Sequence, residues 1–268
     1  MPFLGGDART ARWVRGCHRI RDNGGVALYR DEGVVLRTQN LGEADRIVTL
    51  LTRRTGVVRA VGKGVRRTKS RFGARLEPFS HVDLQLHTGR ALDVITQADT
   101  LHAYGESIVA DYSRYTSATA MLETTEKIVV VEKEPALRHF LLLIGALRTL
   151  GENTHDPRMV LDAFLVRSLA VAGYAPALEE CARCGARGAQ PSFAVHAGGV
   201  VCSVCRPHGV ATPAPETVRL MSALLRGDWE AADASEERHR NECSGLVAAY
   251  LQWHLENGIR SLRLVERA

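Results

Sequence analysis

The amino-acid sequence predicts an α+β protein, with a small β-barrel first, a helical domain after it and a cysteine-bearing insert within the helical domain. Three observations predict this order. Segments rich in Val, Ile and Thr fill residues 33–100, helical periodicity begins near Tyr104, and two Cys-x-x-Cys pairs lie between two helical blocks. A length of 268 residues suits one large domain or two to three small ones.

Residues 1–28 precede the first strand-like segment. They contain several arginines but lack the apolar stretch of a secretory signal, and no apolar run in the chain is long enough to cross a membrane. We therefore interpret residues 1–28 as a disordered extension. We expect a cytoplasmic, nucleoid-associated protein with reduced cysteines and no membrane partner.

Residues 29–103 contain about five short strands. The segments GVVLRT, RIVTLLT and GVVRAVG are rich in β-branched residues, and in HVDLQLHT every second residue is apolar, which is typical of a strand with one buried face. Thr88-Gly89-Arg90 then predicts a hairpin turn before ALDVITQADT. This size and strand count fit an OB-type barrel.

Residues 104–178 and 213–268 show apolar residues at helical spacing, so we expect them to form the two parts of one helical domain. Residues 105–130 read as one helix, and a second begins near Leu137 and stops at Gly151. A third ends at Gly173, and a fourth runs from Pro215 to Gly227. A longer last helix places three large side chains on one face: Leu246, Tyr250 and Trp253.

Residues 179–212 form the insert, which is rich in Gly and Cys and has no helical period. Its four cysteines are Cys181, Cys184, Cys202 and Cys205, and 17 residues separate the two pairs. That spacing is typical of a zinc site in which two knuckles close a tetrahedron around one structural Zn²⁺. Disulfides, redox thiols or unconnected core cysteines are the alternatives, and His196 or His208 could replace one ligand. Cys17 and Cys243 have no partner pair.

Positive charge is concentrated in the barrel. From Arg46 to Leu76 there are ten Lys and Arg residues and no Asp or Glu, whereas the remaining 25 basic residues face 30 acidic ones. A local positive field of this kind indicates a polyanion-binding surface, and a solvated basic loop is the alternative. The candidate DNA-binding side chains are Arg37, Arg53, Arg54, Lys63, Arg66, Arg67, Lys69 and Arg71.

Stacking and catalytic groups are sparse. Phe72 is the candidate for stacking on a base, whereas Phe79 precedes a strand and is expected in the core. No phosphate-binding loop or His-Glu-x-x-His motif occurs. Glu123 and Glu126 are expected on a solvated helix face, and His155 before a helix start. We therefore predict no enzymatic activity.

Three strings in the chain look like segments of the bacterial DNA repair protein RecO family. They are GVVLRTQNLGEADRIVTLLTRRTG (33–56), AVGKGVRRTKSRFGARLEPF (60–79) and LAVAGYAPALEECARCG (169–185). The resemblance spans about residues 29 to 265, and all four cysteines of the family's zinc insert are present.

The resemblance implies a recombination mediator that binds single- and double-stranded DNA and anneals complementary strands. It also implies work with RecR, contact with the acidic tail of the single-stranded DNA-binding protein, and help in loading the RecA recombinase. Two other classes use similar features: a zinc-ribbon regulator or RNA-binding factor, and a nuclease or thiol oxidoreductase. Annealing of strands that are coated with the single-stranded DNA-binding protein separates a mediator from a zinc-ribbon regulator or RNA-binding factor. Loss of substrate strands would reveal a nuclease, and thiol turnover would reveal an oxidoreductase.

Overall fold

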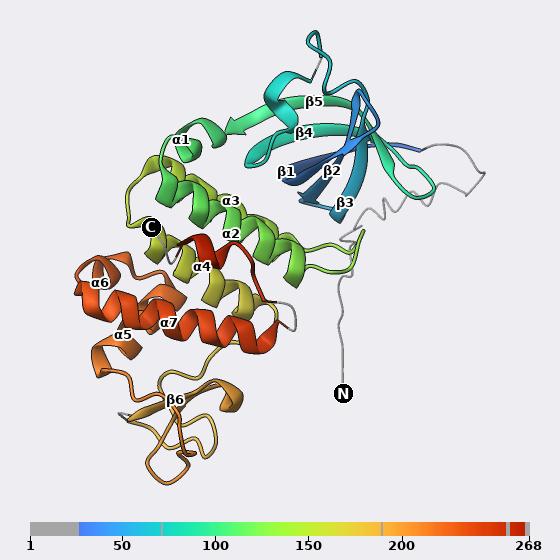
Figure 1. Ribbon diagram of the computed structural model, residues 1–268. Helices are drawn as coiled ribbons and strands as arrows, with labels where there is room; N and C mark the ends of the chain where they lie inside the picture. The colour runs from blue at the N-terminus through green and yellow to red at the C-terminus, as the bar shows by residue number, and fades with distance from the viewer. Residues whose placement is uncertain (1–26, 71, 189, 256–257, 266–268) are drawn as a thin grey trace, which may run out of the picture.

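The computed structural model describes residues 27–70, 72–188, 190–255 and 258–265. The extension expected at residues 1–28 therefore lies outside the described residues, apart from its last two positions. Figure 1 shows three parts: a β-barrel, a layer of helices and a small insert that is separated from the barrel by the helices. The α+β class predicted from the sequence is confirmed.

Five strands form a closed barrel in the order β1-β2-β3-β5-β4. β3 pairs with β5 in parallel and the other neighbouring strands are antiparallel, which is the connectivity of an OB-type barrel. All five predicted strands are present: β1 (Leu28–Leu41), β2 (Asp45–Thr52), β3 (Gly56–Gly62), β4 (Ser80–His87) and β5 (Asp93–Ala103).

The barrel has its own core and a second apolar face. Val82, Leu84 and Leu86 point into the barrel, as their alternation predicts. Val34, Leu51 and other apolar residues of the barrel instead belong to the core that the helices form. The barrel therefore packs directly against the helical layer.

Eight α-helices are described: α1 (Gly105–Val109), α2 (Tyr112–Ile128), α3 (Leu137–Glu152), α4 (Pro157–Val171), α5 (Pro215–Arg226), α6 (Trp229–Asp233), α7 (Glu237–His254) and α8 (Leu262–Val265). Gly227 follows α5 in a left-handed conformation that favours glycine, as the predicted helix stop requires.

Three helix predictions are wrong in detail. Residues 105–130 form two helices because the Asp111 carboxylate accepts the Arg114 N–H at 2.8 Å and begins α2 anew. Gly151 lies inside α3, which ends instead at the left-handed Asn153. Trp253 is 59% exposed and does not share the buried face of α7.

The loop between α2 and α3 ties the helices to the barrel. The Lys133 N–H donates to the Val57 carbonyl at 2.9 Å, and its ammonium lies 2.9 Å from the buried carboxylate of Asp93. The Tyr29 hydroxyl donates to the same carboxylate at 2.6 Å. Burial alone would raise the pKa of Asp93, but these hydrogen bonds and Lys133 hold it below its ordinary value.

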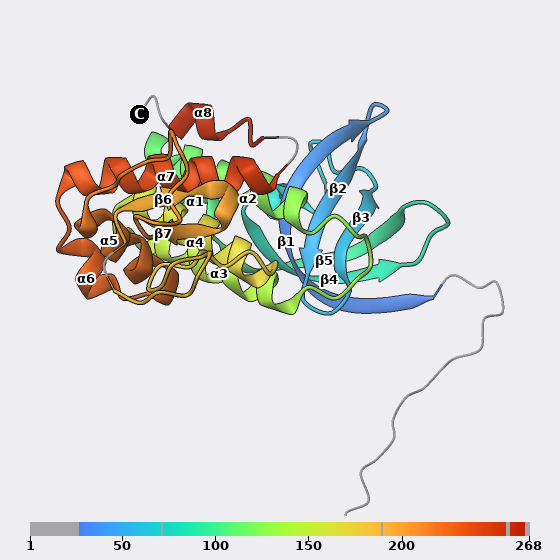
Figure 2. The ribbon, with the colours of Figure 1, turned by 90° about the horizontal axis from the view of Figure 1, so that it is seen from below.

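The insert carries two short strands, β6 (Ser192–Ala194) and β7 (Gly199–Val201). It is attached through a bridge between Ala177 and Gly199 and through Phe193, whose ring meets Tyr250 of α7 at 5.8 Å. Figure 2, in which the molecule is seen from below, shows the insert in front of the helices and the barrel to one side.

Candidate metal centre and nucleic-acid interface

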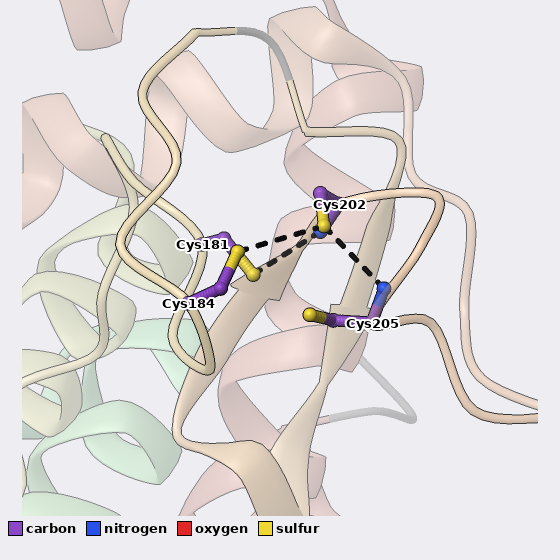
Figure 3. A group of neighbouring side chains, drawn as sticks. All are labelled: Cys181, Cys184, Cys202 and Cys205. Carbon is purple, nitrogen blue, oxygen red and sulfur yellow. Dashed lines mark hydrogen bonds between the residues drawn. The ribbon is translucent and has the colours of Figure 1, made fainter.

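The four cysteines of the insert converge on one point. Cys181 and Cys184 come from the first knuckle and Cys202 and Cys205 from the second, and all four Sγ atoms lie within 4.8 Å of one another. Figure 3 shows the four side chains turned toward a shared centre. The two Cys-x-x-Cys pairs therefore come together in one cluster, as the sequence predicts.

The knuckle backbone is shaped to support thiolates. The Cys202 N–H donates to Cys181 Sγ and the Cys205 N–H to Cys202 Sγ, each at 3.4 Å. The Gly185 N–H closes the first knuckle on the Cys181 carbonyl at 2.8 Å, and Gly185 has a φ of 70°, in the left-handed region. Glycine at this position lets the chain turn tightly behind the sulfurs.

The thiols perturb one another strongly. Backbone N–H groups, that of Cys202 first, lower the pKa of Cys181 to about 6. The neighbouring Cys202 and Cys184 side chains raise the pKa of Cys205 to about 12. Four thiolates this close repel one another, so a bound cation is needed to ionise them together.

The donor set fits a tetrahedral metal ion. Zinc–sulfur bonds of about 2.3 Å in a tetrahedron place the sulfurs about 3.8 Å apart. The Cys184 and Cys202 Sγ atoms are 3.8 Å apart. A four-thiolate site leaves no position for a substrate, so a metal held here serves structure.

The other candidate ligands lie outside this cluster. His196 packs against Trp253, with ring centroids 6.2 Å apart, and His208 is exposed. Cys243 is buried in the helical core, where burial raises its pKa well above the ordinary value. Cys17 lies outside the described residues.

The basic loop, residues 62–75, is held by its own apolar side chains. Val65, Phe72 and Leu76, just beyond it, are buried in the barrel core. The Gly64 N–H donates to the Asp45 carboxylate at 2.7 Å. In its described residues the loop is thus a series of anchored turns, at the upper end of Figure 1.

The Gly-Lys-Gly sequence has a structural reason. A Cβ on Gly62 would lie 2.6 Å from the Val65 side chain, which is too close for any other residue without a shift. Gly64 has a φ of 70°, which a side chain strains. The two glycines therefore let the chain leave β3 and turn while Lys63 stays on the surface.

Four cations of the basic loop share one environment. Each is exposed, and within the described part of the chain none has an ion pair with a carboxylate; they are Lys63, Arg66, Arg67 and Lys69. Arg66 is also positioned, because its guanidinium donates to the Gly42 carbonyl at 3.1 Å. These side chains form the candidate nucleic-acid interface, and Arg71 lies outside the described residues.

The remaining three candidates lie elsewhere. Arg53 and Arg54 are in the turn between β2 and β3, at the opposite end of β3 from Lys63. Seven residues of strand separate these ends by roughly 23 Å. The Arg37 guanidinium lies 2.8 Å from the Glu126 carboxylate, and Arg53 lies 3.0 Å from Glu32. The structure therefore separates Arg53 and Arg54 from Lys63 by the length of β3, whereas Arg37 lines one cavity together with Ala74 of the basic loop.

Phe72 was expected to be available for stacking, and this prediction is wrong. Its side chain is only 1% exposed and fills the barrel core. Phe79 is buried, as expected, and packs edge-on against Tyr115. No stacking side chain of the basic loop is therefore exposed among its described residues.

The residues considered for catalysis have structural roles. The Glu123 carboxylate accepts the N–H groups of Arg260 and Ser261, both at 2.9 Å, and so holds the chain before α8, rather than lying on a solvated face. His155 stacks on Trp229 with ring centroids 4.1 Å apart and forms a hydrogen bond with Asp233 at 2.8 Å.

Among the described residues, no helix has the length and apolar content of a membrane span.

Comparison with known proteins covers nearly the whole chain. A family model described as "Recombination protein O N terminal" matches residues 26–104, and one described as "Recombination protein O C terminal" matches residues 109–263. The DNA repair protein RecO of Thermobifida fusca is 76% identical over 243 residues, which are 91% of this chain and 100% of that protein. Those of Frankia casuarinae and Streptomyces griseus are 61% and 59% identical over 91% and 90% of this chain, and each is covered fully.

Proposed function

This chain belongs to the RecO family, and on that premise we propose that it is a recombination mediator that binds single- and double-stranded DNA and anneals complementary strands. The observation that carries the proposal is the basic loop of the OB-type barrel. Four exposed cations without carboxylate partners in the described chain sit there on an anchored backbone. Unpaired cations are available to phosphates, whereas Arg37 and Arg53 must first leave their own ion pairs.

The contacts we propose are to phosphates. Arginine can donate two parallel N–H groups to one phosphate, and lysine acts as a point charge. Because the loop exposes no stacking ring among its described residues, binding is expected to depend on charge rather than on base sequence. Neutralising the phosphates lowers the repulsion between two strands, which is the physical requirement for annealing.

For the cysteine cluster we propose one structural Zn²⁺. The sulfur separation and the N–H donors around the sulfurs support this choice over disulfides or redox thiols. Bound zinc would supply the charge that lets all four thiolates ionise together. We propose no catalytic function for the protein, since Glu123 and His155 are occupied by structural contacts.

Three partners are proposed from family membership alone. We propose that the chain forms a complex with RecR, contacts the acidic tail of the single-stranded DNA-binding protein, and helps to load RecA. Action on chromosomal DNA would place it at the nucleoid in the cytoplasm. Pull-down at low salt with RecR and with the tail peptide tests the first two, and absence of both would reject the mediator role while leaving DNA binding open.

The decisive experiment is strand annealing with and without the single-stranded DNA-binding protein as a coat. A mediator should anneal complementary strands in both cases, whereas a zinc-ribbon regulator or RNA-binding factor would not anneal coated strands. The variant with glutamine at the four loop cations should lose annealing in parallel with DNA affinity. Normal annealing by a variant that is folded and contains zinc would reject the loop as the DNA site.

A further inference from the structure

A second cationic surface lies on the knuckles of the insert. From Cys181 to Thr212 the chain contains three arginines and no Asp or Glu. Arg183, Arg187 and Arg206 are exposed, and no ion pair to a carboxylate is found for them in the described part of the chain. The nearest acidic residue along the chain, Glu180, pairs with Arg187 only through the backbone.

The arginines are not buried against the rest of the protein. Val204, between Cys202 and Cys205, is 91% exposed, so the second knuckle faces solvent. Arg206 follows this knuckle directly, and Arg183 lies within the first. All three are therefore on or beside the two turns that hold the metal ligands, where a closed metal site would fix the backbone beneath them.

The charge of the metal site does not cancel that of the arginines. One Zn²⁺ with four thiolates carries two negative charges, so residues 181–212 keep a net positive charge of about one; of the two glutamates that precede them, Glu179 is paired with Arg226, and Glu180 lies beside Arg187. Cys181 is buried, Cys202 and Cys205 are half-buried and Cys184 is exposed, and the three guanidinium groups are exposed as well. A phosphate can therefore reach the guanidinium groups from solvent and accept their N–H groups.

The insert surface and the basic loop are separate. The barrel and the insert have different apolar cores, and the helical core lies between them. In Figure 1 the insert and the barrel lie on opposite sides of the helices. A single DNA strand held on the basic loop thus leaves the knuckle arginines free for another DNA segment.

We propose that Arg183, Arg187 and Arg206 form a second phosphate-binding site, so that one molecule bridges two DNA segments. This inference rests on the proposed function, because the first segment is held by the basic loop. Its consequence is physical: two segments tethered to one protein meet at a raised effective concentration without any new contact between them. The insert then serves annealing directly as well as the stability of the fold.

The test uses strands that cannot pair. A short oligothymidine is tethered to beads, the full-length zinc-loaded protein is added, and capture of a second, labelled oligothymidine is measured. The insert variant carries Arg183→Gln, Arg187→Gln and Arg206→Gln. A matched control loses the same charge from three exposed arginines that have carboxylate partners: Arg148→Gln, Arg219→Gln and Arg238→Gln.

The insert variant should capture the second strand at least about tenfold less well, because bridging needs both sites. Its affinity for one short strand, its zinc content and its mass in solution should match those of the wild type, and the control should behave as the wild type throughout. Undiminished capture of the second strand by the insert variant would overturn the inference. The arginines would then bind another partner or offset the negative charge of the metal site.

The two proposals fail separately. The glutamine variant of Lys63, Arg66, Arg67 and Lys69 should lose affinity for one short strand as well as capture of the second. If it keeps that affinity, the basic loop is not the DNA site and the proposed function loses its support. If it loses affinity while the insert variant captures normally, only the second site is rejected.

Discussion

Replacing the four exposed cations of the basic loop with glutamine should make DNA binding less dependent on salt. Each phosphate contact on a single strand contributes about 0.7 to the slope of log affinity against log salt concentration. Four lost contacts should therefore lower that slope by about 2.8. Between about 50 and about 200 mM salt, the wild type should lose roughly 50-fold more affinity than the variant.

The variant carries Lys63→Gln, Arg66→Gln, Arg67→Gln and Lys69→Gln. Fluorescence anisotropy of a labelled oligothymidine across a salt series measures the slope, and a mixed-sequence strand should give the same difference. The loss of stability should be small, because these side chains are exposed and have no carboxylate partner in the described chain. Arg66 also bonds to the Gly42 carbonyl, so thermal unfolding and zinc content must be checked for this variant.

A matched control removes four positive charges elsewhere. It replaces exposed arginines that already have carboxylate partners, Arg30, Arg148, Arg219 and Arg238, with glutamine. A general effect of net charge would lower the slope equally in both proteins. A control slope near the wild-type value with a shallower loop-variant slope supports the site. Equal slopes in all three proteins would refute the reasoning.

Three further perturbations test other parts of the molecule. Removing the proposed metal with a chelator, or the change Cys184→Ser, should unfold residues 179–212 and leave the barrel intact, because the insert has few buried apolar side chains of its own. Amide exchange measured by segment checks this. Asp162 is buried between α4 and α7, where burial raises its pKa to about 7 against an ordinary 3.8, so the folded state keeps a proton that the unfolded state releases. The free energy of unfolding should therefore fall as pH rises from about 4 to about 7, by at most about 4 kcal/mol, and level off above that. Urea unfolding of Asp162→Asn should lack this fall. Parallel curves of unfolding free energy against pH for the two proteins would contradict it. Glu123→Ala should cost about 2 kcal/mol and speed amide exchange in residues 258–265, because the carboxylate holds the chain before α8; unchanged exchange there would show that the anchor is dispensable.

Periodicity and turn chemistry were enough to predict most of the fold. The alternation of Val82, Leu84 and Leu86 was visible because one face of β4 is buried in the barrel. Gly173 and Gly227 mark helix ends because both adopt left-handed conformations. The cysteine cluster was equally predictable, since the two-residue spacing within each pair is itself the geometry of a knuckle.

The errors came from features that sequence spacing does not encode. Gly151 was taken as a helix stop, but its small size serves close packing: a Cβ there would lie 3.1 Å from the Ser107 hydroxyl. Arg53 and Arg54 are near Lys63 in sequence but lie at the opposite end of β3, because a strand separates its two ends by its full length, and their contact with DNA stays a prediction. The insert arginines are not recognisable as a charged segment, because three charges spread over the insert make no run in the sequence.

The burial of Phe72 changes how the basic loop is understood. A ring exposed beside the cations would stack on a base and hold it against the protein, and that base would have to be released before it could pair. Because Phe72 instead anchors the loop in the barrel core, the described cations are presented without a competing ring. Contacts to phosphates alone leave the pairing edges of the bases free. The annealing that we propose requires a strand to be held while a second strand pairs with it, and fixed charge serves this better than stacking; the buried ring fixes the backbone that carries that charge.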